Sequence, residues 1–215
     1  MSGHDTNLMR IDPLCPDLSI IRRTSEMIRA GGLVVFPTRA LYGIGANALD
    51  SAAVDRVFKI KRRPENKPIS VLISSRADLD NLVADIPGPA KTLMDRFWPG
   101  NLTILFTAST SVPENLTAQT GKIGIRLPAH PVAAALVKAV STPLTATSAN
   151  ISGHAGCSDI STLPDPICLH VSGILDAGVL SGGSGSAVID VTTNPPVIVR
   201  QGDIPASLLK RASTC

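Results

Sequence analysis

RVFKIKRRPENKPISVLI, residues 56 to 73, is the stretch in which a predicted helix gives way to a predicted strand. The spacing of Val54, Val57, Phe58 and Lys61 fits one face of a helix. An apolar run over residues 69–73 follows and predicts a buried strand. Six cations and one acid occupy residues 56–67, whereas the net charge of the whole chain is only +3.

This basic cluster has two interpretations. Lys59 and Lys61 suit the negative C-terminal end of a helix, but Arg62, Arg63 and Lys67 lie beyond that end. The cluster is therefore either a solvated surface with one sign of charge or a binding site for an anionic partner. The residues of the cluster alone leave both interpretations open.

Helices and strands alternate outward from this stretch in both directions. Helices are predicted over 17–30, 51–61, 75–83, 89–97, 131–140 and 205–211. Strands are predicted over 33–36, 69–73, 102–106, 122–126, 144–146, 187–191 and 197–200. The alternation predicts an α/β protein with one domain, a twisted, mostly open mixed sheet flanked by helices, over residues 17–212. Residues 1–16 are expected to form a loose polar arm.

The composition excludes several classes of protein. Hydrophobic residues make up 44% and charged residues 17% of the 215 residues, which is typical of a globular chain. Aromatic residues, at 3%, are too few for a platform that stacks single-stranded nucleic acid. Apolar runs all fall short of the roughly 18 residues that cross a membrane, and the N-terminus lacks the apolar core of a secretory signal.

The four cysteines do not form a CxxC pair, which predicts a reduced, cytoplasmic protein. His154, Cys157, Cys168 and His170 lie close together in the sequence. Structural zinc sites usually take their ligands as spaced pairs, and only one residue separates Cys168 from His170. We expect loop and core positions here and no structural metal.

Polar residues that directly follow predicted strands are the candidate ligand-binding residues, because ligands of open α/β sheets bind at strand ends. The segment PTRALYGIG, residues 37–45, offers the hydroxyls of Thr38 and Tyr42 beside two glycines. Ser148 and Asn150 are two residues apart, so an extended backbone would point them to the same side.

Arg126 and Arg200 end two predicted strands, and their guanidinium groups suit bidentate recognition of carboxylate and phosphate. The run GGSGS, residues 182–186, fits a tight turn or a loose phosphate cradle but lacks the Gly-Lys-Ser/Thr ending of a P-loop. The sequence contains no G-x-S-x-G nucleophile motif. These features predict a chain that binds and aligns anions rather than one that presents a nucleophile.

Seven strings occur in an order that resembles one known family. They are PTRALYGIGANA (37–48), KRRPENKPI (61–69), FWPGNLTIL (97–105), IGIRLPAHP (123–131), TATSANISG (145–153), GSGSAVIDV (183–191) and VRQGDI (199–204). Together they resemble the YrdC-type threonylcarbamoyl-AMP synthases over roughly residues 17–205. The resemblance implies a YrdC-like catalytic domain with a basic concave cavity.

The resemblance also implies a reaction. Enzymes of this family condense L-threonine, bicarbonate and ATP, the latter with Mg²⁺, to threonylcarbamoyl-AMP and pyrophosphate. A partner transferase then moves the threonylcarbamoyl group to an adenosine next to the anticodon of certain tRNAs. The partners expected from the resemblance are thus the three substrates, that transferase and RNA, without a membrane.

Site residues follow from the same likeness. The implied catalytic residues are Lys61, Arg63, Ser148 and Asn150. The implied ATP-binding residues are Arg63, Lys67, Lys122, Ser148, Asn150 and Arg200. The implied threonine-binding residues are Thr38, Ala40, Arg126, Ala146 and Ser186. Departures from the common family pattern occur at Arg39, Ala40, Leu72 and Gly185.

Two alternatives stay open from the sequence. Related domains of hydrogenase maturation proteins handle carbamoyl-adenylate, and a changed amino-acid pocket is compatible with such a shift. A non-enzymatic protein that binds double-stranded RNA through the basic cluster is the other alternative, with binding that weakens steeply as salt rises.

Overall fold

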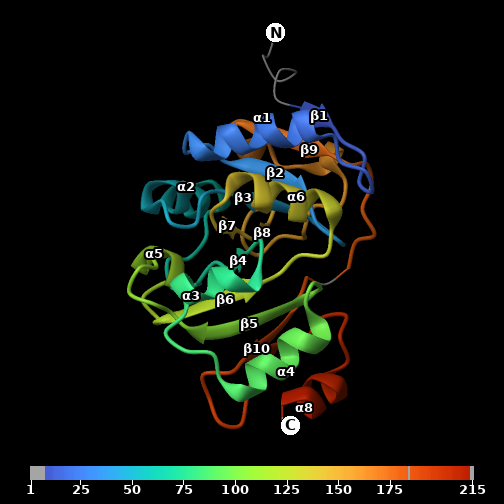
Figure 1. Ribbon diagram of the computed structural model, residues 1–215. Coiled ribbons are helices and arrows are strands. Elements are labelled where there is room, and N and C mark those ends of the chain that lie inside the picture. Colours follow the sequence, from blue (N-terminus) through green and yellow to red (C-terminus); the bar gives the residue numbers. More distant parts are fainter. Residues whose placement is uncertain (1–7, 184, 214–215) are drawn as a thin grey trace.

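The computed structural model describes residues 8–183 and 185–213 and confirms an α/β architecture with mixed sheets (Figure 1). The strands are β1 (Leu8–Arg10), β2 (Val34–Pro37), β3 (Tyr42–Gly45), β4 (Val71–Leu72), β5 (Leu102–Thr107), β6 (Lys122–Arg126), β7 (Leu144–Thr145), β8 (Thr147–Ser148), β9 (Gly173–Asp176), β10 (Ala187–Asp190) and β11 (Val197–Arg200). The helices are α1 (Leu18–Arg29), α2 (Ser51–Lys61), α3 (Leu79–Leu82), α4 (Gly88–Phe97), α5 (Glu114–Thr117), α6 (Pro131–Val140), α7 (Asp165–Cys168) and α8 (Ala206–Ser213).

The strands divide into two sheets rather than the single sheet expected from the sequence. One sheet has the order β1-β9-β2-β3-β8, and the other has the order β11-β10-β5-β6-β4-β7. In Figure 1 the first sheet lies toward the N-terminus at the top and the second toward the C-terminus at the bottom. The chain passes from β7 to β8, and so from one sheet to the other, through the single residue Ala146.

Helices cover the outer faces of both sheets. α1 and α6 pack against each other and onto β2, where Ile28, Phe36 and Leu136 are fully buried in a shared apolar cluster. α4 and α8 pack together beside the second sheet, at the C-terminal end of the molecule (Figure 1). Burial of these apolar faces, at about 25 cal/mol per Å², is the main force that holds the layers together.

Helix α2 ends where the sequence predicts. Asp50 caps its first turn by accepting hydrogen bonds from the backbone N–H groups of Ala52 and Ala53. Arg62 closes the helix in the left-handed region at φ 49°, and the N–H of Arg63 then donates to the carbonyl of Phe58. This turn carries the basic cluster away from the helix axis and toward the gap between the sheets.

Short strands account for most of the differences from the predicted elements. β1 lies within the segment expected to be a loose arm and pairs in parallel with β9, whereas residues 1–7 lie outside the described residues. β3 lies in the segment 37–45, where the sequence predicts no strand beyond residue 36, and glycines such as Gly43 and Gly45 are unfavourable in strands. A Cβ atom on Gly45 would lie 2.9 Å from the ring of Phe36, so packing against β2 requires glycine there.

No helix in the part of the chain that the structure describes is long and apolar enough to span a membrane.

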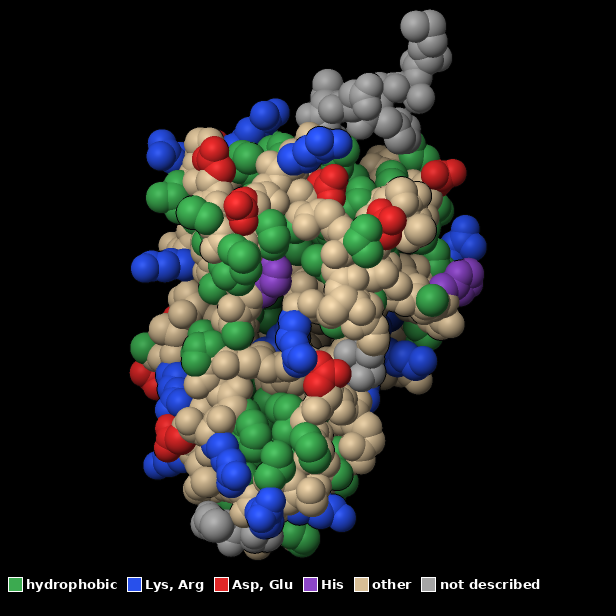
Figure 2. Space-filling model, turned by 90° about the vertical axis from the view of Figure 1, so that its right-hand side faces the viewer, with side chains coloured by type: hydrophobic (Ala, Val, Ile, Leu, Met, Phe, Trp, Pro, Cys, Tyr) green, Lys and Arg blue, Asp and Glu red, His purple; other side chains and the backbone are tan. Residues whose placement is uncertain are grey.

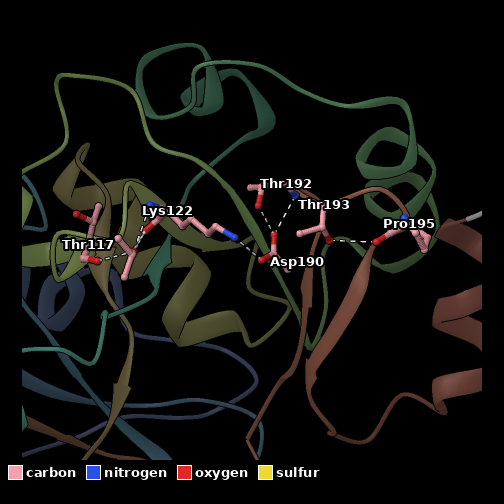
Figure 3. A network of polar contacts seen from close by, with 7 residues as sticks. Thr117, Lys122, Asp190, Thr192, Thr193 and Pro195 are labelled. Atoms are coloured by element: carbon pink, nitrogen blue, oxygen red, sulfur yellow. Dashed lines mark hydrogen bonds and ion pairs between the residues drawn. The ribbon is translucent and has the colours of Figure 1, made fainter.

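A polar network ties the far end of β6 to β10 (Figure 3). Lys122 Nζ donates to the carboxylate of Asp190 at 2.8 Å, and Thr192 donates to the same carboxylate through its N–H and its hydroxyl. Burial raises the pKa of Asp190, but the hydrogen bonds from Lys122 and Thr192 outweigh burial, so that the pKa lies below its ordinary value. The network therefore stabilises the folded state only while Asp190 is ionised.

Replacing Asp190 with asparagine is expected to lower the free energy of unfolding by about 1 kcal/mol at neutral pH. Because the folded-state pKa is depressed, this stability is present above the unfolded-state pKa of about 3.9 and is lost as the pH falls through the folded-state value. Urea denaturation at pH 7 and near pH 3 measures it. Equal stability losses at both pH values, or a similar loss in the exposed control Asp80→Asn, would contradict this role.

Candidate functional site

A cavity of about 220 Å³ opens between the two sheets, and both sheets contribute to its wall. Its polar lining comprises three arginines and seven residues with hydroxyl groups: Arg63, Arg126, Arg200, Thr38, Tyr42, Ser70, Thr103, Thr147, Ser148 and Ser186. Asp and Glu do not occur among the described residues that line it. The surface is visibly hollowed at mid-height in Figure 2, where basic side chains gather. The cavity is thus a positively charged space without an acidic counterion of its own.

Two of its arginines are held by backbone carbonyls. Arg63 donates from Nε to the carbonyl of Lys67 at 2.8 Å and from Nη2 to the carbonyl of Pro68 at 2.7 Å. Arg200 donates from Nε and Nη2 to the carbonyl of Ser186, at 2.9 and 2.8 Å. Burial lowers the pKa of both guanidinium groups, and the charge of Arg200 lowers the pKa of Arg63 further. A neutral carbonyl fixes each side chain but leaves its charge uncompensated.

Arg126, at the end of β6, has fewer side-chain hydrogen bonds than the other two arginines. Its Nη1 donates to Oδ1 of Asn101 at 2.9 Å, whereas its buried Nε has no hydrogen-bond partner. Burial and then the charge of Arg200 lower its pKa to about 10. A buried donor without a partner is costly, and a bound anion would satisfy it. This geometry suits a carboxylate or a phosphate oxygen.

Lys61 lies behind the cavity wall. Its side chain is almost fully buried, and Nζ donates to the carbonyls of Ser148 and Asn150 at 2.5 and 2.7 Å and to Oδ1 of Asn150 at 3.2 Å. Burial, and secondarily the charge of Arg63, lowers its pKa to about 7. The three hydrogen bonds from Lys61 therefore hold the loop of residues 148–150 in place from behind the cavity wall.

The loop itself is closed by its own polar groups. Ser148 Oγ donates to Oδ1 of Asn150, and Nδ2 of Asn150 donates to the carbonyl of His154 at 2.6 Å. Of this pair only Ser148 lines the cavity. The hydroxyl of Ser148 is thus held at the cavity wall by the buried amide of Asn150, which also accepts a hydrogen bond from the buried ammonium of Lys61.

The remaining predicted site residues divide into two groups. Thr38, Ala146 and Ser186 line the cavity, where the Ser186 hydroxyl lies 2.8 Å from that of Thr103 and 3.0 Å from Nη2 of Arg200. Ala40, Lys67 and Lys122 do not line it.

The three residues that do not line the cavity, Ala40, Lys67 and Lys122, make other contacts. Ala40 is buried, and its carbonyl accepts from the N–H of Gly182 at 3.0 Å. Lys67 is exposed, and its carbonyl holds Arg63. Lys122 pairs with Asp190 at the opposite end of β6 from Arg126, so the structure does not bring it to the cavity.

Sequence reasoning missed two polar residues at the site, Asn101 and Thr103. Asn101 contacts Arg126, and Thr103 lines the cavity. Thr103 is a buried hydroxyl in the predicted strand 102–106, and this was the available signal for a polar wall. Asn101 follows Gly100 in a turn, where asparagine is common for local reasons, so nothing in its position distinguishes it.

The cavity alone is smaller than the usual range for ligands of nucleotide size. It shares Arg63 with an adjacent open groove of about 780 Å³ formed by α2, residues 62–66 and residues near α5. A large anionic ligand that spans the two would place charged groups at the shared arginine.

A family model described as telomere recombination, Sua5/YciO/YrdC, matches residues 26–202. The chain belongs to this family. Its α/β fold with two mixed sheets is that of the family: the crystal structure of Escherichia coli YciO superposes with a TM-score of 0.84 at 30% identity, covering 92% of this chain and 96% of YciO.

Family members of known structure and activity are also similar to this chain. It is 39% identical over 191 residues to the threonylcarbamoyl-AMP synthase of Pyrococcus abyssi (strain GE5 / Orsay), covering 89% of this chain and 56% of that enzyme. The crystal structure of P. abyssi Sua5 complexed with L-threonine superposes with a TM-score of 0.91 at 36% identity, covering 96% of this chain and 61% of that one. The chain thus spans a little over half the length of this curated relative.

Proposed function

We propose that this member of the Sua5/YciO/YrdC family is an L-threonylcarbamoyladenylate synthase, a nucleotidyltransferase that serves tRNA modification. The observation that carries the proposal is the convergence of Arg63, Arg126 and Arg200 on one cavity whose lining has no carboxylate. Three anionic reactants, the carboxylate of threonine, bicarbonate and the triphosphate of ATP, match this excess of positive charge. The similarity to a relative whose crystal structure holds L-threonine supports the amino-acid substrate.

The positions and free donors of the three arginines indicate which group of the substrates each one binds. The carboxylate of threonine is assigned to Arg126, whose Nε lacks a partner. The phosphates of ATP are assigned to Arg63 and Arg200, because Arg63 borders both the cavity and the large groove. The hydroxyls of Ser148 and Ser186 provide further donors between these positions.

The reaction requires positioning more than a protein nucleophile. The amino nitrogen of threonine attacks the carbon of bicarbonate, and loss of water leaves a carbamate. A carbamate oxygen then attacks the α-phosphorus of ATP, and the bond from that phosphorus to the oxygen bridging the β-phosphorus breaks, which releases pyrophosphate. Fixed guanidinium groups neutralise the approaching anions and the charge that develops on the leaving group.

Magnesium enters this proposal as part of the nucleotide substrate. Mg²⁺ prefers carboxylates, phosphates and water as ligands. The described residues of the cavity offer hydroxyls but no carboxylate, so they do not form a magnesium site of their own. Mg²⁺ would therefore arrive with ATP. A role of Lys67 and Ala40 in substrate binding, and transfer of the product to tRNA by a partner enzyme, remain parts of the proposal, whereas Lys122 is taken up by its ion pair with Asp190.

Pyrophosphate release from ATP and bicarbonate tests the function. We expect release that requires L-threonine and falls at least about tenfold with L-serine, because one methyl group in a packed pocket contributes about 1–3 kcal/mol. Mass spectrometry should identify threonylcarbamoyl-AMP as the product. Absence of release with any amino acid in a folded, ATP-binding protein would contradict the proposal. Salt-sensitive binding of double-stranded RNA without turnover would instead support the RNA-binding alternative.

A further inference from the structure

A chain of three polar contacts leads from the buried Arg126 to the protein surface. Arg126 Nη1 donates to Oδ1 of Asn101 at 2.9 Å, and Nδ2 of Asn101 donates to Oδ2 of Asp203 at 3.0 Å. The same carboxylate oxygen accepts from Nη1 of Arg39 at 2.7 Å. The side chain of Asp203 is 33% exposed, so the chain ends in solvent.

The chain of contacts joins the two sheets across the mouth of the cavity. Arg39 lies on the turn between β2 and β3 of the first sheet, and Asp203 follows β11 of the second sheet. The carbonyl of Arg39 also accepts from the hydroxyl of Ser181. The ion pair therefore holds three segments that border the site.

The carboxylate of Asp203 determines which way the Asn101 amide faces. A carboxylate only accepts hydrogen bonds, so the NH₂ end of the amide must face Asp203 and the oxygen must face Arg126. Without Asp203 the NH₂ end of the amide loses its acceptor, and only the guanidinium of Arg126 still favours this orientation. The Asn101 side chain is then free to turn away, and Arg126 would lose its acceptor.

Arg126 also has space in which to move. A second cavity of about 150 Å³ adjoins it, lined in part by Thr38, Asn101 and His130. Packing alone therefore does not lock the guanidinium in place. Within residues 8–183 and 185–213, the Oδ1 atom of Asn101 is the only hydrogen-bond partner of the Arg126 side chain.

We propose that Asp203 is a positioning residue that, through Asn101, holds Arg126 in the orientation that binds the carboxylate of the amino-acid substrate. This inference rests on the proposed function for the identity of the substrate, but the positioning of Arg126 does not depend on it. Among the described residues, the side chain of Asp203 forms hydrogen bonds with Asn101 and Arg39, neither of which lines the 220 Å³ cavity.

Steady-state kinetics of Asp203→Ala test the role. The KM for L-threonine should rise about tenfold, whereas the KM for ATP stays unchanged, because loss of one hydrogen bond to a charged group has roughly this effect. The matched control is Asp95→Ala, which removes another exposed carboxylate paired with an arginine, Arg76. A change in thermal stability without this split in the two KM values would overturn the inference.

A double substitution and an NMR measurement complete the experiment. If Asp203 acts through Asn101, the double variant Asn101→Ala/Asp203→Ala should have the same threonine KM as Asn101→Ala alone. The Nε–H signal of Arg126, observed by heteronuclear NMR, should shift or broaden in Asp203→Ala and not in Asp95→Ala. An Nε–H signal of Arg126 that is unchanged in Asp203→Ala would overturn the inference, even if the protein has no turnover. A wild-type protein that fails to release pyrophosphate would count against the proposed function alone.

Discussion

Replacement of Lys61 with methionine is expected to lower the free energy of unfolding by about 2–3 kcal/mol and to abolish pyrophosphate release. Methionine fills nearly the same volume, so the variant isolates the loss of the ammonium from cavity formation. Three acceptors on Ser148 and Asn150 lose their donor, and only part of this loss is offset by relief from burying a charge. Residues 148–150 should then lose their fixed conformation, and the Ser148 hydroxyl should lose its fixed position at the cavity wall.

The measurement is urea denaturation together with a pyrophosphate assay, both at about pH 6.5. This pH lies below the Lys61 pKa of about 7, so the ammonium carries its proton. Lys91→Met, an exposed lysine of α4, is the control and should match the wild type. Wild-type stability in Lys61→Met would show that the three contacts do not hold the loop.

Replacement of Arg126 with leucine is expected to separate stability from function. The variant should raise the KM for L-threonine about 100-fold or more, because removing one partner of a buried charge pair costs about 2–5 kcal/mol. Its free energy of unfolding should stay the same or rise. Burial and Arg200 lower the pKa of Arg126, so the folded protein holds this charge at a cost. One hydrogen bond to Asn101 offsets this cost less than the three hydrogen bonds of Lys61 do.

Calorimetric titration with L-threonine and thermal unfolding measure the two effects. Arg126→Lys should fall between the wild type and Arg126→Leu, since lysine keeps the charge but not the two-pronged geometry. Arg22→Leu removes an exposed arginine of α1 and serves as the control. Threonine binding as tight in Arg126→Leu as in the wild type would contradict the assignment.

The sequence predicted elements well wherever local signals were strong. α1 and α2 begin where the sequence predicts helices, and Asp17 and Asp50 cap their first turns. The capping box of Ser75 and Asp78 is present, although it opens a short 3-10 turn, residues Arg76–Asp78, before α3. Short strands such as β1 and β8 lack a repeating pattern and form only because a neighbouring strand pairs with them.

The candidate site was predictable to the extent that its residues end strands or form turns within the family-like strings. Arg63, Arg126 and Arg200 meet at the cavity, as a shared anion site requires. Lys122 lies on the same strand as Arg126 but at its other end, where it pairs with Asp190, a partner that the sequence pattern did not indicate. Asn101 could not be recognised, because its role depends on Asp203, which is 102 positions away in the sequence.

Ala146 limits how far the two sheets can move relative to each other, because it joins them through a single residue. It lines the cavity and is the shortest link between the sheets, whereas the other links run from β3 to β4 and from β9 to β10 through much longer segments. Its N–H donates to the carbonyl of Ser70 at 2.7 Å, which continues the pairing of β7 with β4 and fixes one end of the link to the second sheet. A rotation that widened the gap would strain the backbone torsions of this residue before those of the longer links. A ligand packed against Ala146 would restrict these torsions further.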